Sequence, residues 1–164
     1  MIEFEIRAAT GADERFLRAM QYQALFVEPG EDPFPEAIVD EPHIARYYTG
    51  FGGQLGDVGR VAVESSGDSA GEPIGAAWVR RSTRDNPSYG YIDDETPELG
   101  IAVTSDCRGA GVGSALLDDL LGVLPRCCLS VDSRNPAVRL YERSGFEVVR
   151  HDGMSLMMLR VREP

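Results

Sequence analysis

The stretch SDCRGAGVGSALLDDLL, residues 105–121, places three glycines between a basic side chain and an apolar helical run. Directly upstream, ELGIAV over residues 98–103 predicts a β-strand. A helix N-terminus leaves backbone N–H groups unpaired and carries a partial positive charge. Glycine lets an anion approach that backbone closely and permits positive φ. Strand, glycine turn and helix therefore predict a site for a phosphate or diphosphate, to which Arg108 adds a guanidinium.

Several phosphate ligands compete for such a turn. A nucleoside triphosphate loop requires a lysine after its glycines, and none follows here. A dinucleotide loop requires G-x-G-x-x-G directly after the strand, whereas Gly113 comes one position early and five residues separate Val103 from Gly109. Asp132, beyond the next strand, keeps a nicotinamide dinucleotide open as an alternative.

The rest of the chain alternates between strand and helix patterns. We expect strands over 2–8, 60–64, 74–80, 127–131, 146–150 and 154–161, and helices over about 10–27, 35–48 (broken at Pro42) and 135–145. Strands dominate and the late helices act as crossovers. This order predicts one α/β (α+β) domain over residues 1–164, with helices on both faces of a mixed sheet.

Composition excludes several classes of function. The 27 acidic and 16 basic side chains give a net charge of -11, which opposes binding to nucleic acid or an anionic membrane. We expect neither a transmembrane helix nor a signal peptide. Three cysteines without a framework spacing favour a reducing, cytoplasmic setting, and neither histidine has a metal-ligand spacing, so we expect no metal.

The glycine turn also satisfies the pattern [Q/R]-x-x-G-x-[G/A], through Arg108, Gly111 and Gly113. On these residues the chain resembles the GCN5-related N-acetyltransferase (GNAT) family. PELGIAV, NPAVRLYERSGFE and EPIGAAWVR resemble that family's fourth strand, its second signature and its third strand. The resemblance covers the whole chain and implies a mostly antiparallel, seven-stranded sheet with acetyl-coenzyme A as co-substrate.

The resemblance implies where the coenzyme binds. Its diphosphate would lie on the glycine turn, and its pantetheine arm would pair with the exposed edge of the strand over 98–103, splayed from its neighbour. The N–H of Val103 is the candidate for polarising the thioester carbonyl. The implied coenzyme-binding residues are Ile101, Ala102, Val103, Arg108, Gly109, Ala110, Gly111, Val112, Gly113, Ser114 and Asn135.

The implied reaction is direct attack of a primary amine on the thioester. Tyr141 occupies the family's general-acid position, and its ordinary pKa near 10 keeps the hydroxyl protonated at neutral pH. Glu98 opens the strand beside the acyl site and is the candidate general base, acting directly or through a water. Asn135 both caps its helix and is a candidate coenzyme contact.

The sequence does not identify the acceptor of the acyl group. The variable segments, including the loop over 82–97 with Tyr89 and Tyr91, would form its site, with Trp78 either beside them or in the core. A small-molecule amine and a protein amine both fit, as do acetyl and longer acyl donors. The resemblance also allows a homodimer, and a module that binds or senses acyl-coenzyme A without turnover is the alternative function.

Overall fold

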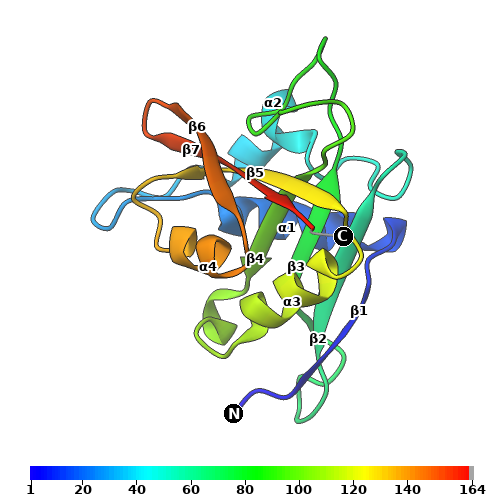
Figure 1. Cartoon of the computed structure of the whole chain (residues 1–164). Helices are drawn as coiled ribbons and strands as arrows, with labels where there is room; N and C mark the ends of the chain where they lie inside the picture. The colour runs from blue at the N-terminus through cyan, green and yellow to red at the C-terminus, as the bar shows by residue number, and fades with distance from the viewer. Residues whose placement is uncertain (163–164) are drawn as a thin grey trace.

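The computed structural model describes residues 1–162, which form a single seven-stranded sheet with four α-helices (Figure 1). The elements, in chain order, are β1 (Phe4–Ala8), α1 (Glu14–Ala24), α2 (Pro42–Ala45), β2 (Val58–Glu64), β3 (Pro73–Arg80), β4 (Glu98–Val103), α3 (Val112–Leu121), β5 (Arg126–Asp132), α4 (Ala137–Arg143), β6 (Glu147–Asp152) and β7 (Ser155–Val161). Short 3-10 turns precede α1, α2 and α3. The seven strands and the mixed sheet expected from the sequence are confirmed.

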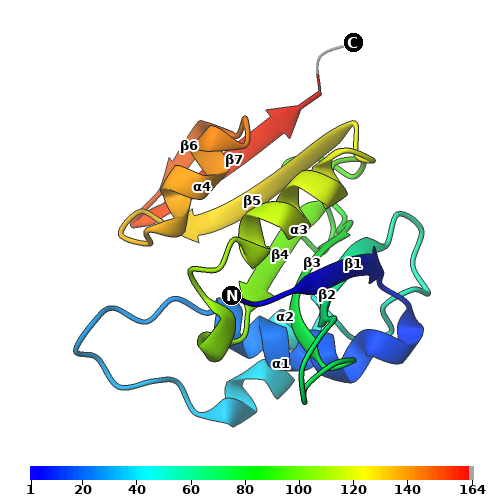
Figure 2. The same ribbon diagram turned by 90° about the horizontal axis from the view of Figure 1, so that it is seen from below.

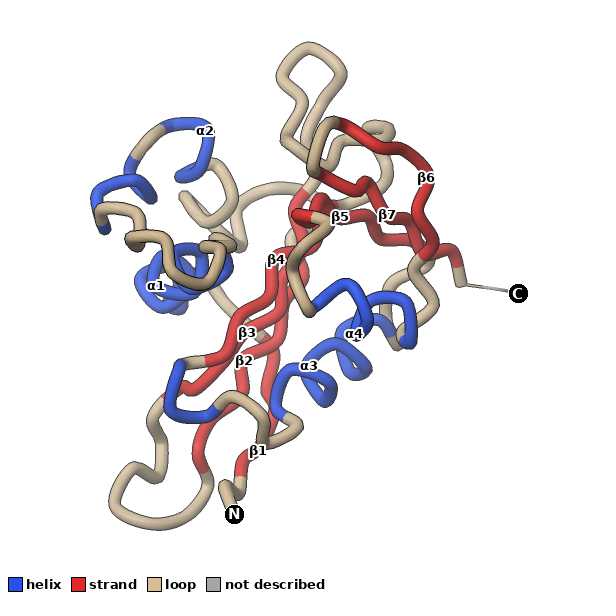
Figure 3. Tube along the Cα trace, turned by 90° about the vertical axis from the view of Figure 1, so that its left-hand side faces the viewer, coloured by secondary structure: helices blue, strands red, loops and turns tan. Residues whose placement is uncertain are grey.

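The strands run in the spatial order β1-β2-β3-β4-β5-β7-β6. All neighbouring pairs in this part of the chain are antiparallel except β4 and β5, which are parallel. Two strands joined in parallel need a crossover, and α3 provides it. In Figure 3, β5, β7 and β6 turn away from β1–β4, so the sheet opens at the β4–β5 junction.

Helices cover both faces of the sheet. Figures 2 and 3 show α1 and α2 on one face and α3 and α4 on the other. Alternation along β3 supplies both cores: Ala77 and Val79 pack with α3, whereas Ala76 and Trp78 pack with α1. Trp78 is therefore a core residue, and its Nε1 donates to the carbonyl of Tyr47 at 2.8 Å.

Element ends follow the local signals, with exceptions at both ends of α1 and at the end of β6. The Thr10–Asp13 capping box forms, but it caps a 3-10 turn that leads into α1, and α1 ends at Ala24 because Leu25 is extended. Pro42 stands at the start of α2, which explains the break. The last hairpin turns after Asp152, so β6 extends past residue 150 and includes His151. No helix within residues 1–162 is long and apolar enough to cross a bilayer.

Candidate active site

The sheet is joined across its β4–β5 junction at one ladder position. Glu98 pairs with Cys128, and the Cys128 N–H donates to the Pro97 carbonyl at 2.9 Å. On its other edge β4 pairs with β3 along its whole length. Beyond Glu98, therefore, the β5-facing edge of β4 has no strand partner among the described residues.

The direction of the β4 backbone groups follows from antiparallel alternation. The Thr104 N–H donates to the Ile74 carbonyl of β3 at 2.8 Å. Alternate residues of an antiparallel strand bond to the same neighbour, so Ala102 faces β3 while Ile101 and Val103 present N–H and C=O groups to the open edge. The Val103 carbonyl indeed accepts from Arg108 Nε at 3.3 Å, outside the β3 ladder. The edge that was expected to hold the coenzyme arm is thus free at these two residues.

A cleft of about 630 Å³ lies along this open edge. Its walls come from β4, the start of α4, the end of α1 and the segment after α1: Tyr22, Gln23, Ala24, Leu25, Phe26, Val27, Pro33, Phe34, Ile101, Ala102, Val103, Arg108, Asn135, Pro136, Ala137, Leu140 and Tyr141. The predicted coenzyme residues of β4, together with Arg108 and Asn135, therefore line one cavity.

The glycine turn at the Arg108 end of this cleft has the conformation that an anion site needs. Gly109 and Gly111 have φ of 79° and 84°, a region that favours glycine. None of the backbone N–H groups from Arg108 to Ser114 donates to a group of residues 1–162. Unpaired amides at the start of the ten-residue α3 are a ready anion site.

Other residues of the turn contribute differently. Gly113 has an ordinary φ, and a Cβ there would lie 3.7 Å from Val103 Cγ2, so the fold itself does not require this glycine. The side chain of Val112 is buried in the core, which leaves only its backbone for a ligand. Ala110 and Ser114 are exposed. Arg108 also donates from Nη2 to Gln23 Oε1 at 2.9 Å, which ties the turn to α1.

Asn135 does cap α4, one position earlier than the helix boundary suggests. The structure begins α4 at Ala137, and Asn135 Oδ1 accepts from the Ala137 N–H at 2.9 Å. The same residue lines the cleft. Both functions proposed for Asn135 are therefore sterically compatible.

A second cavity of about 310 Å³ continues past the β4–β5 junction and shares a wall with the first. The shared residues are Ala24, Leu25, Phe26, Phe34, Ile101, Asn135 and Tyr141. Residues that line only the second cavity are Gln21, Ile44, Tyr47, Tyr89, Glu98, Leu99, Gly100, Ser130, Val131, Asp132 and Ser155. The two candidate catalytic residues, Glu98 and Tyr141, thus meet at one continuous site.

Glu98 sits at the wall of the second cavity with 7% of its surface exposed. Three donors hold its carboxylate: the Tyr47 hydroxyl at 2.8 Å, the Gly90 N–H at 2.9 Å and the Ser88 hydroxyl. Burial raises the pKa of Glu98 above its ordinary value, and these hydrogen bonds oppose that rise. A carboxylate with a raised pKa takes up a proton more readily than an ordinary glutamate does.

Tyr141 borders both cavities and has 8% of its surface exposed. Its ring packs edge-on against Phe146, with centroids 5.9 Å apart. Its hydroxyl has no hydrogen-bond partner in the described chain, yet it is not among fully buried unpaired atoms, so it faces the cavities. Burial, with a smaller contribution from the charge that Cys127 carries when ionised, raises the pKa of Tyr141 to about 12. The hydroxyl is therefore a hydrogen-bond donor at neutral pH.

Sequence reasoning missed Tyr47 and Ser88 as partners of Glu98. In the sequence, Tyr47 fits an apolar position of an expected helix. No local pattern connects it to Glu98, which lies 51 residues further along the chain. Its hydroxyl also accepts from the Tyr89 N–H at 3.0 Å, so it joins the 82–97 loop to the site. Burial and the Glu98 carboxylate raise the pKa of Tyr47 well above its usual value.

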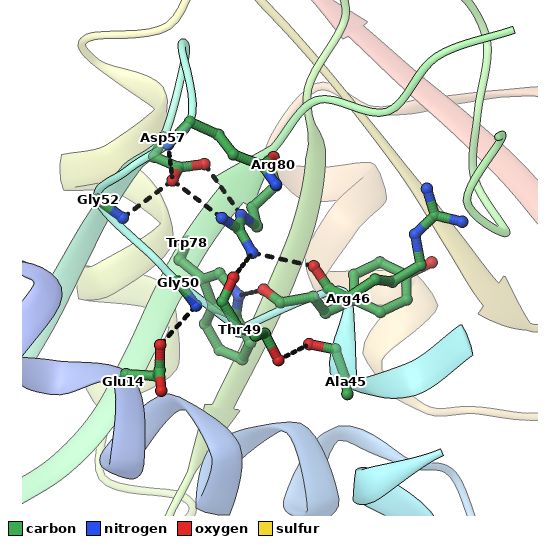
Figure 4. Close-up of polar contacts among 11 residues, drawn as sticks. Glu14, Ala45, Arg46, Thr49, Gly50, Gly52, Asp57, Trp78 and Arg80 are labelled. Atoms are coloured by element: carbon green, nitrogen blue, oxygen red, sulfur yellow. Dashed lines mark hydrogen bonds and ion pairs between the residues drawn. The ribbon is translucent and has the colours of Figure 1, made fainter. Parts of the chain in front are cut away.

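A buried ion pair supports the segment that carries Tyr47 (Figure 4). The side chains of Arg80 and Asp57 are 4% and 2% exposed, and Arg80 Nε lies 3.0 Å from Asp57 Oδ1. Arg80 Nη1 also donates to the carbonyls of Arg46 and Thr49, at 3.0 and 2.5 Å. Asp57 in turn accepts from the Gly52 N–H at 2.9 Å. The pair therefore fixes both ends of residues 46–57.

The family model for the "Acetyltransferase (GNAT) domain" matches residues 57–148, more than half of the chain. The chain belongs to the GNAT acetyltransferase family. The matched residues include β4, the glycine turn and α4, and both β4 and α4 contribute walls to the two cavities.

Relatives of this GNAT protein agree with the family and the fold. The Bacillus subtilis (strain 168) protein named "Putative phosphinothricin acetyltransferase YwnH" is 34% identical over 80 residues, which cover 43% of this chain and 45% of that protein. The chain thus spans less than half the length of this curated relative.

Solved structures match along nearly the whole GNAT chain. The PaiA N-acetyltransferase of Thermoplasma acidophilum, in complex with coenzyme A, has a TM-score of 0.63 and 17% identity, with 98% of this chain and 100% of that chain covered. An acetyltransferase of Thermus thermophilus has a TM-score of 0.64 and 17% identity, with 99% and 100% covered. At this identity the likeness shows the fold alone.

No group of three or more His, Cys, Asp and Glu side chains within residues 1–162 could hold a metal ion.

Proposed function

We propose that this protein transfers an acetyl group from acetyl-coenzyme A to the primary amine of an acceptor by direct attack. One observation carries the proposal: two cavities share Tyr141 in their walls, one reaching Arg108 beside the glycine turn and the other lined by the buried carboxylate of Glu98. The coenzyme supplies the activated acetyl thioester. The chain supplies binding, orientation and proton transfer.

The residues of the first cavity fit the coenzyme. The unpaired amides from Arg108 to Ser114 would hold the diphosphate, aided by the Arg108 guanidinium. The free edge groups of Ile101 and Val103 can pair with amide groups of the pantetheine arm as a neighbouring strand would. The Val103 N–H then remains the candidate for polarising the thioester carbonyl.

Glu98 is proposed to accept the proton that the attacking amine loses. A lysine-like ammonium has a pKa near 10.4, so the acceptor must be deprotonated before it can attack. Because Tyr47, Ser88 and Gly90 already bond to the carboxylate, a water relay is as suitable as direct contact. Either path delivers the proton to a group whose raised pKa favours its uptake.

Tyr141 is proposed to stabilise the leaving sulfur. Its pKa of about 12 lies above the value of about 8.5 for a thiol, so complete proton transfer to a free thiolate is unfavourable. Donation of a hydrogen bond to the sulfur while negative charge develops is favourable, and the departing thiolate is finally neutralised by the proton that the amine released.

Binding and turnover can be tested separately. We expect acetyl-coenzyme A, and not NAD, to raise the melting temperature, because a ligand that binds only the native state stabilises it. Release of free thiol in the presence of a primary amine then establishes turnover. All 16 basic side chains are arginine, so the chain offers no lysine of its own as an acceptor. Binding without thiol release across a broad amine panel would favour the sensing module, and stabilisation by NAD alone would overturn the proposal.

We also infer a reducing compartment, because Cys107, Cys127 and Cys128 are free and buried. The homodimer that the resemblance allows stays a prediction.

A further inference from the structure

The second cavity has no cationic side chain among its described lining residues. Its ionisable members are the carboxylates Glu98 and Asp132 and three tyrosines. Two arginines lie just outside, and both are engaged. Arg134 bonds to both oxygens of Asp132, at 3.0 and 2.8 Å, and to Glu28. Arg46 is held by the side chain and carbonyl of Asn86 and by the Pro87 carbonyl. These partners are neutral oxygens, so Arg46 keeps its positive charge, which lies outside the lining and lowers the pKa of Glu98.

One polar side chain in this cavity lacks a partner. Gln21, on α1, is only 8% exposed, and its carboxamide makes no hydrogen bond to residues 1–162. Every fully buried polar side-chain atom of the described chain does have a partner, so the Gln21 carboxamide keeps contact with the cavity that it lines. A nearly buried amide without a partner is costly unless a ligand or a water completes it.

The remaining walls are mostly apolar. They are formed by Leu25, Phe26, Phe34, Ile44, Leu99, Ile101 and Val131. Phe34 and Tyr89 are also large, exposed side chains. A volume of about 310 Å³ with such walls suits a small organic body.

We propose that the second cavity binds an acceptor whose primary amine is carried on an uncharged, largely apolar body, and that it excludes amines bearing an adjacent carboxylate or phosphinate. Gln21 is the specificity residue, because its carboxamide can bond to a neutral polar group but cannot neutralise an anion. This proposal rests on the proposed function, whose amine acceptor it specifies.

The physical reason is the cost of burying an anion without a partner. An acceptor carboxylate would lose its water in this cavity, and no cationic side chain among the lining residues would pair with it. It would also lie close to the carboxylate of Glu98, which repels it. An acceptor amine has the opposite preference, since the Glu98 carboxylate attracts a positive charge. Phosphinothricin, an amino acid with both a carboxylate and a phosphinate, is therefore expected to be a poor acceptor for this chain.

Three matched ligands test the charge. Phenethylamine, phenylalaninamide and phenylalanine share a phenyl ring and an amine. Phenethylamine has no further polar group, whereas phenylalaninamide has a neutral amide and phenylalanine a carboxylate on the carbon that bears the amine. We expect calorimetric titration to show phenylalanine binding at least tenfold more weakly than the other two, with phenethylamine and phenylalaninamide within about threefold of each other. Equal binding of phenylalanine and phenylalaninamide, or no binding of any of the three, would overturn the proposal.

A charge introduced at Gln21 tests the assignment of the residue. Gln21→Arg places a cation in the cavity and should improve the binding of phenylalanine relative to phenethylamine at least tenfold. Gln54→Arg adds the same charge on an exposed loop outside both cavities and should leave the ratio unchanged. An unchanged ratio in a Gln21→Arg protein with a normal melting temperature refutes the role of Gln21. If that variant does not fold, Gln21→Leu serves instead. It should weaken the binding of phenylalaninamide relative to that of phenethylamine at least threefold. An unchanged ratio of the two affinities would again refute the role of Gln21.

The same titrations are run with and without coenzyme A, so the two proposals fail separately. Absence of coenzyme A binding contradicts the proposed function, while the ranking of the three ligands is still obtained without it. Normal coenzyme A binding and thiol release with phenylalanine as the preferred acceptor contradicts only the acceptor class.

Discussion

The proposed coenzyme and acceptor ends of the candidate active-site cleft are built in different ways. At the coenzyme end, the proposed diphosphate site is a single run of residues: Arg108 to Ser114 supply its unpaired amides, and two positive-φ glycines shape the turn. At the acceptor end, Glu98 is held by side chains and backbone from the α2 region and the 82–97 loop. A site made by one segment depends on local conformation, whereas a site assembled from several segments depends on whatever holds those segments in place.

The comparison is tested most strongly at the Arg80–Asp57 pair, which fixes residues 46–57. Arg80→Leu leaves Asp57 buried without its cation and should reduce the free energy of unfolding by about 3–5 kcal/mol. Among molecules that remain folded, kcat/KM for the amine should fall more than coenzyme A affinity, because Tyr47 belongs to this segment. Urea unfolding and calorimetry measure the two effects. Arg81→Leu, at the exposed neighbouring position, is the control. Equal losses at both ends of the cleft would mean that the pair supports the whole fold and not the acceptor end.

The coenzyme end is tested by Gly111→Asp. A carboxylate about 4 Å from a phosphate repels it by about 4 kcal/mol at an effective dielectric constant of about 20, so coenzyme A should bind about a thousandfold more weakly. Gly67→Asp is a matched control, because Gly67 has a φ of +80° against +84° for Gly111, and neither has an atom within 4 Å of a built Cβ. Both variants should lose similar stability, and only the first should lose affinity in calorimetry. Equal affinities would remove the turn from the binding site.

Tyr141 lies where the two ends meet and should affect turnover without affecting either binding step. Tyr141→Phe should lower kcat about tenfold to a hundredfold, since a hydrogen bond to a charged group contributes about 1.5–3 kcal/mol. The dissociation constant of coenzyme A should change less than twofold. Tyr48→Phe removes another buried hydroxyl, one that donates to the Val39 carbonyl outside both cavities, and should leave kcat intact. Turnover that is equal in the two variants would show that Tyr141 only packs against Phe146.

The smallest expected effect is a pH dependence at Glu98. Because its folded pKa is raised above the ordinary value of 4.5, the native state holds a proton that the unfolded chain releases. Its contribution to stability is fully present below pH 4.5 and is lost as the pH rises through the folded pKa. The free energy of unfolding of the native protein, minus that of Glu98→Gln, should fall by about 1.4 kcal/mol for each pH unit in that window. Urea unfolding from pH 4 upward measures this difference in the free energy of unfolding. A difference that does not change with pH would mean that burial does not raise the pKa of Glu98.

Sequence patterns predicted the coenzyme end better than the acceptor end. The strand over 98–103, the glycine turn and the helix after it lie where the sequence predicted them, because strand, turn and helix signals are local. The functional roles of Glu98 and Tyr141 stay predictions. The helix expected over 10–27 ends at Ala24, where Leu25 to Val27 leave the helix and line the cleft. That exit, the Tyr47–Glu98 bond and the unpaired Gln21 amide all depend on tertiary packing, which a helical pattern does not reveal. At Gly113 the sequence pattern suggested a backbone conformation or a close approach that only glycine allows, and the structure shows neither.

The single ladder pair between β4 and β5 also makes this junction the weakest seam of the sheet. Four strands lie on one side of it and three on the other. A molecule bound across this junction would contact both halves of the sheet and stabilise them against separation. Amide hydrogen exchange should therefore slow in β5, β6 and β7 when the cleft is filled, and the empty protein should open there first.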